Sequence, residues 1–307
     1  GAAEDAGPGA LVAPPLAELA GHSSVAGSQR DLLRRGGEGE EEEEAAEGGK
    51  RGSCHAGKID DVVFGRPEPH LTHRSRILST TLLETVTPDR IRAAAERLAP
   101  VVMPSPLLPL SVDGAGEVLL KCESLHPIGS FKLRGAGNAL LAAPREALRR
   151  GVVTASAGNM AQGVAWWARR LGVPCTAVVP ERAPAAKLGP FERMGGRVLR
   201  VPFDEWWRTM EERGHPDVTG HFVHPVAEAD VIAGNATIGL ELAASVPDAA
   251  AILVPWGGGG LASGIALGLR AAGSDARVIA CEVETAAPRR ASRAAGAPVR
   301  IDYTPSW

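Results

Sequence analysis

The sequence has few aromatic residues and no long apolar run. Aromatic residues make up 4% of its 307 residues and hydrophobic residues 44%, and the formal net charge is −3. No run of about 18 apolar residues occurs, so we expect no membrane span and no membrane partner. A charge so close to zero also argues against a general nucleic-acid binder. These absences favour a soluble globular enzyme.

Closely spaced cysteines are also lacking. The cysteines are scattered at Cys54, Cys122, Cys175 and Cys281, and none belongs to a C-x-x-C pair. This spacing predicts free thiols in a reducing compartment and argues against a disulfide framework or a metal site. No basic segment followed by a long apolar run opens the sequence, so no signal peptide is expected. We therefore predict a cytoplasmic location.

The first part of the sequence has too few apolar residues to form a core. Residues 36–49 read GGEGEEEEEAAEGG, a run that cannot bury enough apolar surface to offset the entropy cost of ordering. We predict that residues 1–87 form a disordered acidic extension; a specific interaction tail is the alternative. The folded region is expected to start with a helix from Pro88 to Leu98, capped by Thr87.

Beyond Pro88, apolar strand patterns alternate with helical ones. This alternation indicates an α/β protein with parallel sheets covered by helices. The predicted strands are Glu117–Cys122, Gly151–Thr154, Cys175–Val179, Arg197–Arg200, Ala251–Pro255 and Arg277–Glu282. The predicted helices include Leu133–Leu141, Ala161–Leu171, Lys187–Met194, Phe203–Arg213, Ile232–Ala244 and Leu261–Ala271.

Lys132 is the first candidate site residue. It lies in the segment GSFKLRGA, among small and apolar residues between a predicted strand and a predicted helix. Desolvation at such a junction makes the amine more readily neutral and nucleophilic, as a Schiff-base lysine requires. A solvated surface lysine is the alternative. The flanking residues Glu123 and Arg134 are interpreted as structural, with Arg134 facing solvent or closing an ion pair.

Two further segments have the composition of anion-binding turns. In Thr154–Gly163 (TASAGNMAQG), small residues after a strand leave backbone N–H groups free to meet an anion such as a carboxylate. The alternative is a tight turn with Asn159 as a helix cap. Gly257–Gly260 lies between a strand and a helix, where consecutive glycine amides can converge on a phosphate. A flexible loop is the alternative, and the spacing matches neither the dinucleotide nor the nucleoside triphosphate motif.

In this order, the three segments resemble the serine/threonine dehydratase family. These are pyridoxal-phosphate enzymes of the tryptophan-synthase-β fold type (fold type II), related to serine racemase. The resemblance covers roughly Pro88 to the last residue and includes His224–Pro225 and Ile232–Glu241. It implies two domains with open parallel sheets and helices on both faces. The large domain would comprise residues 88–153 and 229–307, and the small domain residues 154–228.

The resemblance also implies a role for each segment. Lys132 would form a Schiff base with pyridoxal 5'-phosphate and act as the catalytic base, Phe131 would lie against the ring, and Asn159 would bond its phenolic oxygen. The cofactor-binding residues would be Phe131, Lys132, Asn159, Gly257, Gly258, Gly259 and Gly260. The substrate carboxylate would meet backbone N–H groups of Ser156, Ala157 and Gly158.

The implied reaction is β-elimination, which converts threonine or serine to a 2-oxo acid and ammonia. Serine racemases carry a serine at the position of Ala157, and alanine has no exchangeable proton. Racemisation needs a second acid/base, so elimination is favoured. The alternatives are another β-eliminating or β-replacing enzyme of this fold type, or a non-catalytic relative. The implied partners are a small amino-acid substrate and further copies of the chain, as a dimer or tetramer.

Several positions depart from the family pattern. Met160 replaces a histidine, and Asn235–Ala236 replaces Gln-Gly, which we interpret as a change near a helix start. Pro288 replaces the second acid of the family's cation site beside Glu282, and His221 and His224 lack a third ligand at suitable spacing, so no metal is expected. The family continues well beyond the point that matches Trp307. We therefore expect a fragment with exposed sheet edges and apolar surface.

Overall fold

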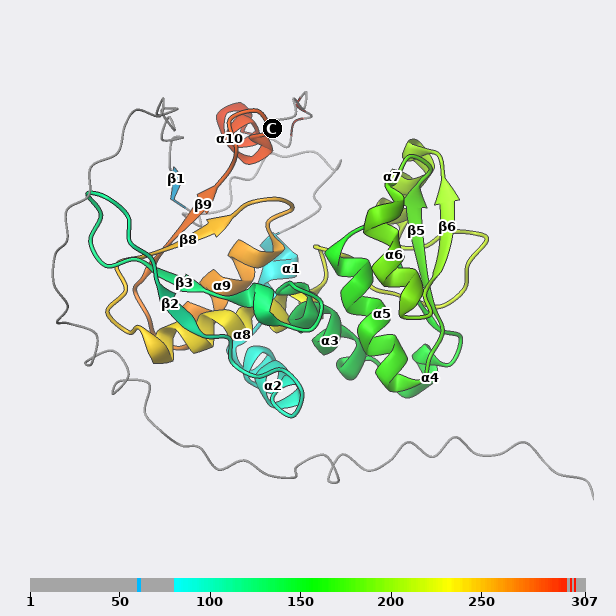
Figure 1. Cartoon of the computed structure of the whole chain (residues 1–307), viewed down its shortest axis with the longest axis horizontal. Helices are drawn as coiled ribbons and strands as arrows, with labels where there is room; N and C mark the ends of the chain where they lie inside the picture. The colour runs from blue at the N-terminus through cyan, green and yellow to red at the C-terminus, as the bar shows by residue number, and fades with distance from the viewer. Residues whose placement is uncertain (1–59, 62–79, 297–298, 300, 302–307) are drawn as a thin grey trace, which may run out of the picture. The chain divides into compact units, whose positions relative to one another are not determined.

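The computed structural model describes residues 60–61, 80–296, 299 and 301 (Figure 1). All described residues belong to one compact unit within Gly57–Trp307. The acidic run at residues 36–49 and Cys54 lie outside the described residues.

A parallel four-stranded sheet has the order β6-β5-β4-β7. Its middle strand β5 contains Ala177, Val178 and Val179, which are all fully buried. Consecutive residues of a strand point to opposite faces, so both faces of this sheet are covered. The strands are β4 (Val152–Thr154), β5 (Cys175–Pro180), β6 (Arg197–Val201) and β7 (His221–Phe222), and the intervening helices are α5 (Asn159–Leu171), α6 (Ala185–Arg193) and α7 (Phe203–Glu212).

A second sheet has three strands in the order β1-β9-β8, and a separate hairpin joins β2 to β3. β8 and β9 are parallel, whereas β1 runs antiparallel to β9. The elements are β1 (Asp60–Asp61), β8 (Ala251–Pro255), α9 (Gly260–Ala271), β9 (Arg277–Cys281) and α10 (Pro288–Ala295), with β2 (Leu107–Pro109) and β3 (Leu119–Lys121) in the hairpin.

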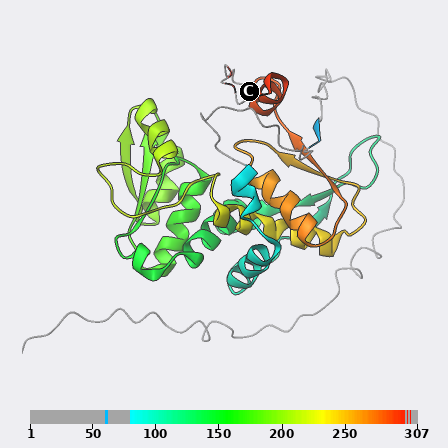
Figure 2. The same cartoon turned by 180° about the vertical axis from the view of Figure 1, so that it is seen from behind.

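Helix α8 (Ala229–Ser245) packs against three other helices, as Figure 2 shows from behind. Its residues Val231–Gly239 are all buried, so this part of the helix is covered on every side. A Cβ atom added at Gly268 of α9 would overlap the carbonyl oxygen of Ala236 on α8. The helices therefore approach at backbone distance, which only glycine permits. The three neighbours are α2 (Pro88–Leu98), α3 (Lys132–Ala142) and α9.

The predicted strands and helices are confirmed, with their ends shifted by a few residues. Thr87 caps α2 as predicted, because its hydroxyl accepts from the Arg90 amide at 3.2 Å. The interpretation of Asn235 as a helix-start residue is wrong, because α8 begins at Ala229 and Asn235 lies inside it. The short elements that the sequence did not predict are α1 (Thr80–Glu84), α4 (Arg145–Leu148), the 3-10 helix Glu123–Leu125, β1, β2, β7 and α10.

The predicted disordered extension reaches too far towards the folded region. Its residues 80–87 are described: they include α1, and Val86 is buried against Ile91 and Ala94. Apolar side chains thus order this stretch, whereas most of residues 1–79 lie outside the described part of the chain. None of the helices in the described residues has the length and apolar composition that a bilayer crossing requires. Of the described cysteines, Cys122, Cys175 and Cys281 are free thiols, as predicted.

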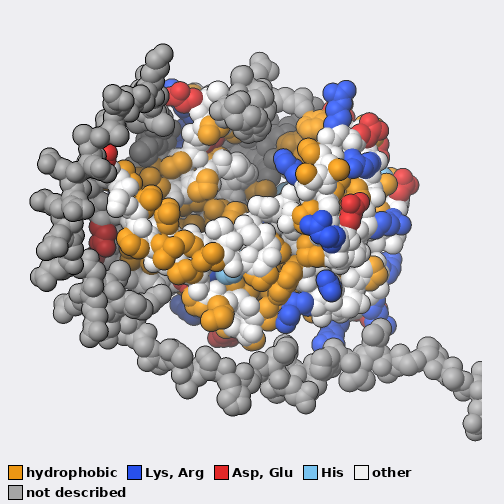
Figure 3. Space-filling view, in the orientation of Figure 1, with side chains coloured by type: hydrophobic (Ala, Val, Ile, Leu, Met, Phe, Trp, Pro, Cys, Tyr) orange, Lys and Arg blue, Asp and Glu red, His pale blue; other side chains and the backbone are white. Residues whose placement is uncertain are grey.

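Apolar side chains are exposed on β8 and on the β2–β3 hairpin. Leu253 of β8 is 60% exposed, and Leu108 and Leu120 of the hairpin are 48% and 47% exposed. Figure 3 shows hydrophobic side chains gathered on this face. β8 is also an edge strand of its sheet among the described residues. These strands carry the exposed apolar surface that the sequence predicted.

Candidate active site

Lys132 begins helix α3, one residue earlier than predicted. The Ser130 hydroxyl accepts from the backbone N–H of Lys132 at 3.2 Å, and the Phe131 carbonyl accepts from the Arg134 amide at 3.0 Å. Gly129, with φ of 67°, turns the chain into this helix. The small and turn residues before Lys132 therefore direct the helix start and satisfy its first amides.

The amine of Lys132 is largely buried. Its Nζ atom donates to the Pro225 carbonyl at 2.6 Å and lies 5.2 Å from the centre of the Phe131 ring. Burial lowers the pKa of Lys132 to about 8. About a tenth of the amine is therefore neutral at pH 7, whereas at its ordinary pKa of 10.5 well under a thousandth would be.

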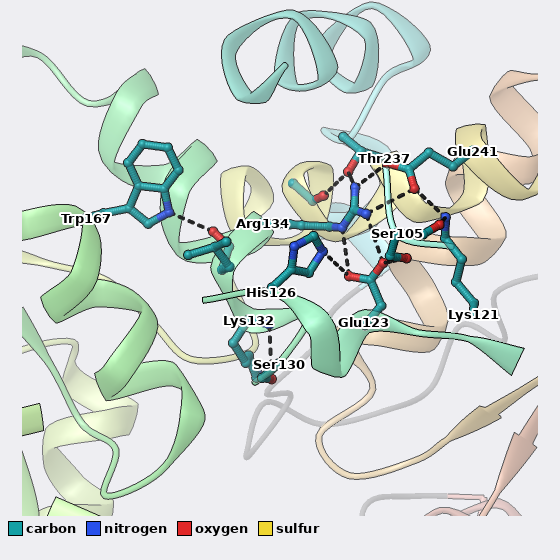
Figure 4. Close-up of polar contacts among 12 residues, drawn as sticks. Ser105, Lys121, Glu123, His126, Ser130, Lys132, Arg134, Trp167, Thr237 and Glu241 are labelled. Carbon is teal, nitrogen blue, oxygen red and sulfur yellow. Dashed lines mark hydrogen bonds and ion pairs between the residues drawn. The ribbon is translucent and has the colours of Figure 1, made fainter. Parts of the chain in front are cut away.

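Arg134, two residues after Lys132 on α3, joins a buried network of charged side chains (Figure 4). The guanidinium of Arg134 donates to both oxygens of Glu123 at 2.8 Å, to both oxygens of Glu241, and to the Thr237 hydroxyl at 3.1 Å. Lys121 forms a second ion pair with Glu241. Of the two interpretations of Arg134, the ion pair is confirmed and the solvent-facing side chain is wrong, because Arg134 is only 1% exposed.

Glu123 lies at the centre of this network. It also accepts from the Ser105 hydroxyl at 2.6 Å, and His126 Nε2 lies 3.1 Å from its Oε2. Burial alone would raise the pKa of Glu123, but hydrogen bonds from His126 and Arg134 and the charge of Arg134 lower it to about 2. The network therefore fixes the segment before Lys132 onto α8 with paired charges.

The Ser156–Asn159 turn connects β4 to α5. Its Gly158 amide donates to the Ser156 hydroxyl at 3.2 Å, so one of the predicted anion donors already has an acceptor. Asn159 is exposed and begins α5, with Gly158 at the cap position and no capping bond from a side chain. Met160 is buried in the core with Leu133, so it replaces a polar side chain with apolar packing.

The glycine turn, Gly257–Gly260, connects β8 to α9. Gly259 has φ of 87° and stands at the cap of α9, whose first amides have no partners within the helix. A Cβ atom added at Gly257 would meet no atom within 4 Å, whereas one at Gly258 would lie 2.7 Å from Val226 Cγ2. The buried Asn235 Nδ2 donates to the Gly260 carbonyl at 3.2 Å. The turn is thus open on one side and closely supported on the other.

The loop of residues 224–228 joins the lysine to the glycine turn. Pro225 accepts from Lys132, and the neighbouring Val226 contacts Gly258. Apart from the His224–Pro225 match, no sequence pattern predicted this loop, because its contacts are one backbone carbonyl and one valine side chain. Among the hydrogen bonds of the described residues, none links the Lys132 amine to the Ser156–Asn159 turn or to the glycine turn itself.

The residues considered for a metal have other partners. His224 Nδ1 accepts from the Val226 and Ala227 amides at 3.0 and 2.7 Å. The Glu282 carboxylate accepts from the first amides of α10, at Arg289 and Arg290. In the described part of the chain, no group of three His, Cys, Asp or Glu side chains could hold a metal ion.

Comparison with known proteins places this geometry in a family. Residues 98–307 match the family model described as pyridoxal-phosphate dependent enzyme. L-threonine ammonia-lyase of Geobacter sulfurreducens is 44% identical over 193 residues, which cover 61% of this chain and 47% of the relative. Serine racemase of Oryza sativa subsp. indica is 36% identical over 218 residues, or 70% of this chain and 64% of the relative.

A solved structure supports the same family. Maize serine racemase has a TM-score of 0.64 and 34% sequence identity, covering 70% of this chain and 67% of the other. The chain spans about half the length of the curated relatives it matches. The matched region is more than half of the chain and contains Lys132, the Ser156–Asn159 turn and the glycine turn. The fold is that of the fold type II enzymes, and the chain belongs to the family of pyridoxal-phosphate dependent enzymes.

Proposed function

We propose that the chain carries the cofactor site of an ammonia-lyase that converts threonine or serine to a 2-oxo acid and ammonia. The observation that carries this proposal is the buried amine of Lys132, whose pKa is lowered to about 8. A Schiff-base lysine has to be neutral to react, and burial provides this. The ammonia-lyase relatives support the reaction class.

The described residues fit pyridoxal phosphate. The glycine turn combines open space at Gly257 with the free amides of a helix start, which suits a phosphate group. Gly257, Gly258, Gly259 and Gly260 would hold that phosphate, Lys132 would bind the cofactor's aldehyde carbon, and Phe131 would lie against its ring. The roles of Phe131 and Asn159 remain proposals from the family resemblance.

The chemistry divides between cofactor and chain. When bound, the cofactor withdraws electrons from the α-carbon of an amino acid. The neutral Lys132 Nζ accepts a proton, with Pro225 as the carbonyl that orients it. The carboxylate of the substrate would meet the Ser156, Ala157 and Gly158 amides. Because Gly158 already donates to the Ser156 hydroxyl, a bound carboxylate would replace that hydroxyl as acceptor.

Ala157 favours elimination over racemisation. Its side chain is partly buried against the core and has no proton to exchange. A racemase needs a second acid/base on the substrate face opposite the lysine. The racemase relatives make this a reaction to test, and another β-eliminating or β-replacing activity is the remaining alternative.

The experiment is to add pyridoxal phosphate to the purified chain and record the visible spectrum, then supply L-threonine, L-serine and substituted alanines. We expect a Schiff-base band, formation of 2-oxo acid and ammonia from threonine or serine, and no D-serine. Lys132→Ala should abolish the band and the products. A band without product from any substrate would contradict the ammonia-lyase proposal while leaving the cofactor site in place.

A further inference from the structure

The 224–228 loop supports both parts of the proposed cofactor site. The Pro225 carbonyl lies 2.6 Å from Lys132 Nζ, and the next residue, Val226, lies beneath Gly258. Because the two contacts come from adjacent residues, a shift of this loop would move both. The residues that hold the loop in place therefore affect the surroundings of the Lys132 amine.

Bonds within the loop give it its shape. His224 Nδ1 accepts from the amides of Val226 and Ala227, and Glu228 Oε2 accepts from the His224 amide at 2.7 Å. These bonds connect loop residues only to one another. They define a compact turn whose far end is tied to α8, because Glu228 caps that helix and its carbonyl accepts from the Ile232 amide at 2.9 Å.

Arg213 supplies a second anchor, from the end of α7. Its Nη2 atom donates to the Ala227 carbonyl, which lies next to Val226. Burial lowers the pKa of His224, and the positive charge of Arg213 lowers it further. Burial raises the pKa of Glu228 to about 7, and Arg213 partly opposes this rise. Arg213 therefore interacts with the loop through a hydrogen bond and through its charge.

The backbone conformation of Arg213 is also unusual. Arg213 ends α7 in the left-handed region, with φ of 56° and ψ of 40°, and no other non-glycine residue in the described part of the chain has a positive φ. This conformation is strained for an arginine because of its Cβ atom, whereas glycine would adopt it freely. Non-glycine residues in such conformations cluster at functional sites. An arginine here is expected to compensate through its side chain.

We propose that Arg213 is a positioning residue for Lys132: through the Ala227 carbonyl it holds the 224–228 loop, so that Pro225 stays against the lysine amine and water stays away from it. This inference rests on the proposed function for the importance of Lys132. The positioning itself is a property of the chain without cofactor and is measured there.

The test is Arg213→Gly, which removes the guanidinium and relieves the backbone. The titration of Lys132 is followed in the cofactor-free chain by acylation with acetic anhydride across pH 6 to 11, with peptide mass spectrometry to resolve the sites. The exposed Lys187 is the reference within each sample. The exposed Arg208 on the same helix provides the charge-matched control, Arg208→Ala.

We expect Arg213→Gly to shift the titration of Lys132 upward by about one pKa unit, a roughly tenfold loss of neutral amine at pH 7. Arg208→Ala should leave it unchanged, and Arg213→Lys should restore part of the effect. An unchanged Lys132 titration in Arg213→Gly would overturn the proposal, even if the unfolding midpoint moved. A shift that disappears in high salt would also overturn it, because it would reflect charge alone.

The cofactor spectrum of the unmodified chain separates this inference from the proposed function. If pyridoxal phosphate gives no Schiff-base band, the proposed function fails, and the titration still decides the role of Arg213. If the band forms, Arg213→Gly should weaken apparent cofactor binding more than Arg208→Ala does. Equal binding by the two variants would count against positioning.

Discussion

The lysine side and the glycine side of the candidate site are held by different forces. On the lysine side, Arg134 joins Glu123 and Glu241 in a buried network with at least two positive and two negative charges. On the glycine side, Gly258 of the turn packs closely against Val226, and Gly268 of the helix that follows, α9, packs against Ala236 of α8.

The difference follows from what each side would bind. A lysine that has to lose its proton needs a rigid setting without a net charge, and paired ions provide one. A turn that receives a phosphate needs free amides and space, which glycine leaves open. Ion pairs stabilise one side, and the absence of side chains shapes the other.

Breaking the lysine side should have the largest effect. Arg134→Met leaves Glu123 and Glu241 buried with only part of their charge compensated, so we expect a loss of about 3–5 kcal/mol in the free energy of unfolding, measured in urea. The control is Arg149→Met at the exposed pair with Glu146, where both side chains are 75% exposed and a change below about 1 kcal/mol is expected. Equal effects of the two substitutions would show that the buried network contributes no more to the free energy of unfolding than an exposed ion pair.

Breaking the glycine side should cost less, because helices can shift to admit a methyl group. Gly268→Ala places a Cβ against the Ala236 carbonyl, and we expect a loss of about 1–3 kcal/mol by urea unfolding. Gly116→Ala is the matched control, since a Cβ there meets no atom within 4 Å. Unchanged stability in Gly268→Ala would show that α8 and α9 do not pack as closely as described.

The titration of Lys132 sharpens the comparison. The folded chain lowers its pKa from 10.5 to about 8, so between these values the unfolded chain binds more protons and stability rises with pH. Lys132→Met should be more stable than the parent below pH 8 by about 1 kcal/mol, after allowance for partial exposure, and should lack this rise. Urea unfolding at pH 7.5 and 9.5 tests this, with the exposed Lys187→Met as control. If the stability of Lys132→Met rose equally between these pH values, the rise would come from another titrating group.

The accessibility of native cysteines provides a test of the two sides that requires no substitution. Cys122 lies between Lys121 and Glu123, and Cys281 pairs its carbonyl with the Trp256 amide before the glycine turn. Both are partly exposed, whereas burial raises the pKa of Cys175 to about 12. We expect a maleimide at pH 7 to label Cys122 and Cys281 and to spare Cys175. Phosphate should slow labelling at Cys281 more than at Cys122; equal slowing would argue against an anion site at the glycine turn.

Local patterns predicted the helices and strands well, because each carries its own signal in the chain. Thr87 and Pro88 mark the start of α2, and the apolar run Ala251–Pro255 is β8. β7 was missed because its two residues are too short to show a period. The isolated sequence therefore predicts the main alternation of strands and helices but misses β7 and the other short elements.

The site was less predictable, because its contacts join distant residues. Lys132 stood out from its neighbours, but the burial of Arg134 required a second carboxylate from α8. The contact between Lys132 and Pro225 involves a backbone carbonyl, which no residue type signals. Met160 was noted as the replacement of a histidine, and the structure shows it to be a core residue.

The pairing of β4 with β7 has a consequence for the order of folding. The strands are parallel neighbours, with Val152 opposite His221, although three helices and two strands separate them in the chain. Contacts between such distant residues carry a large loop-closure entropy and are expected to form late. The Pro225 carbonyl follows β7, so the nascent chain should keep Lys132 solvated and fully protonated until this last strand docks. The neutral form of Lys132 is then expected to appear only once the sheet is complete.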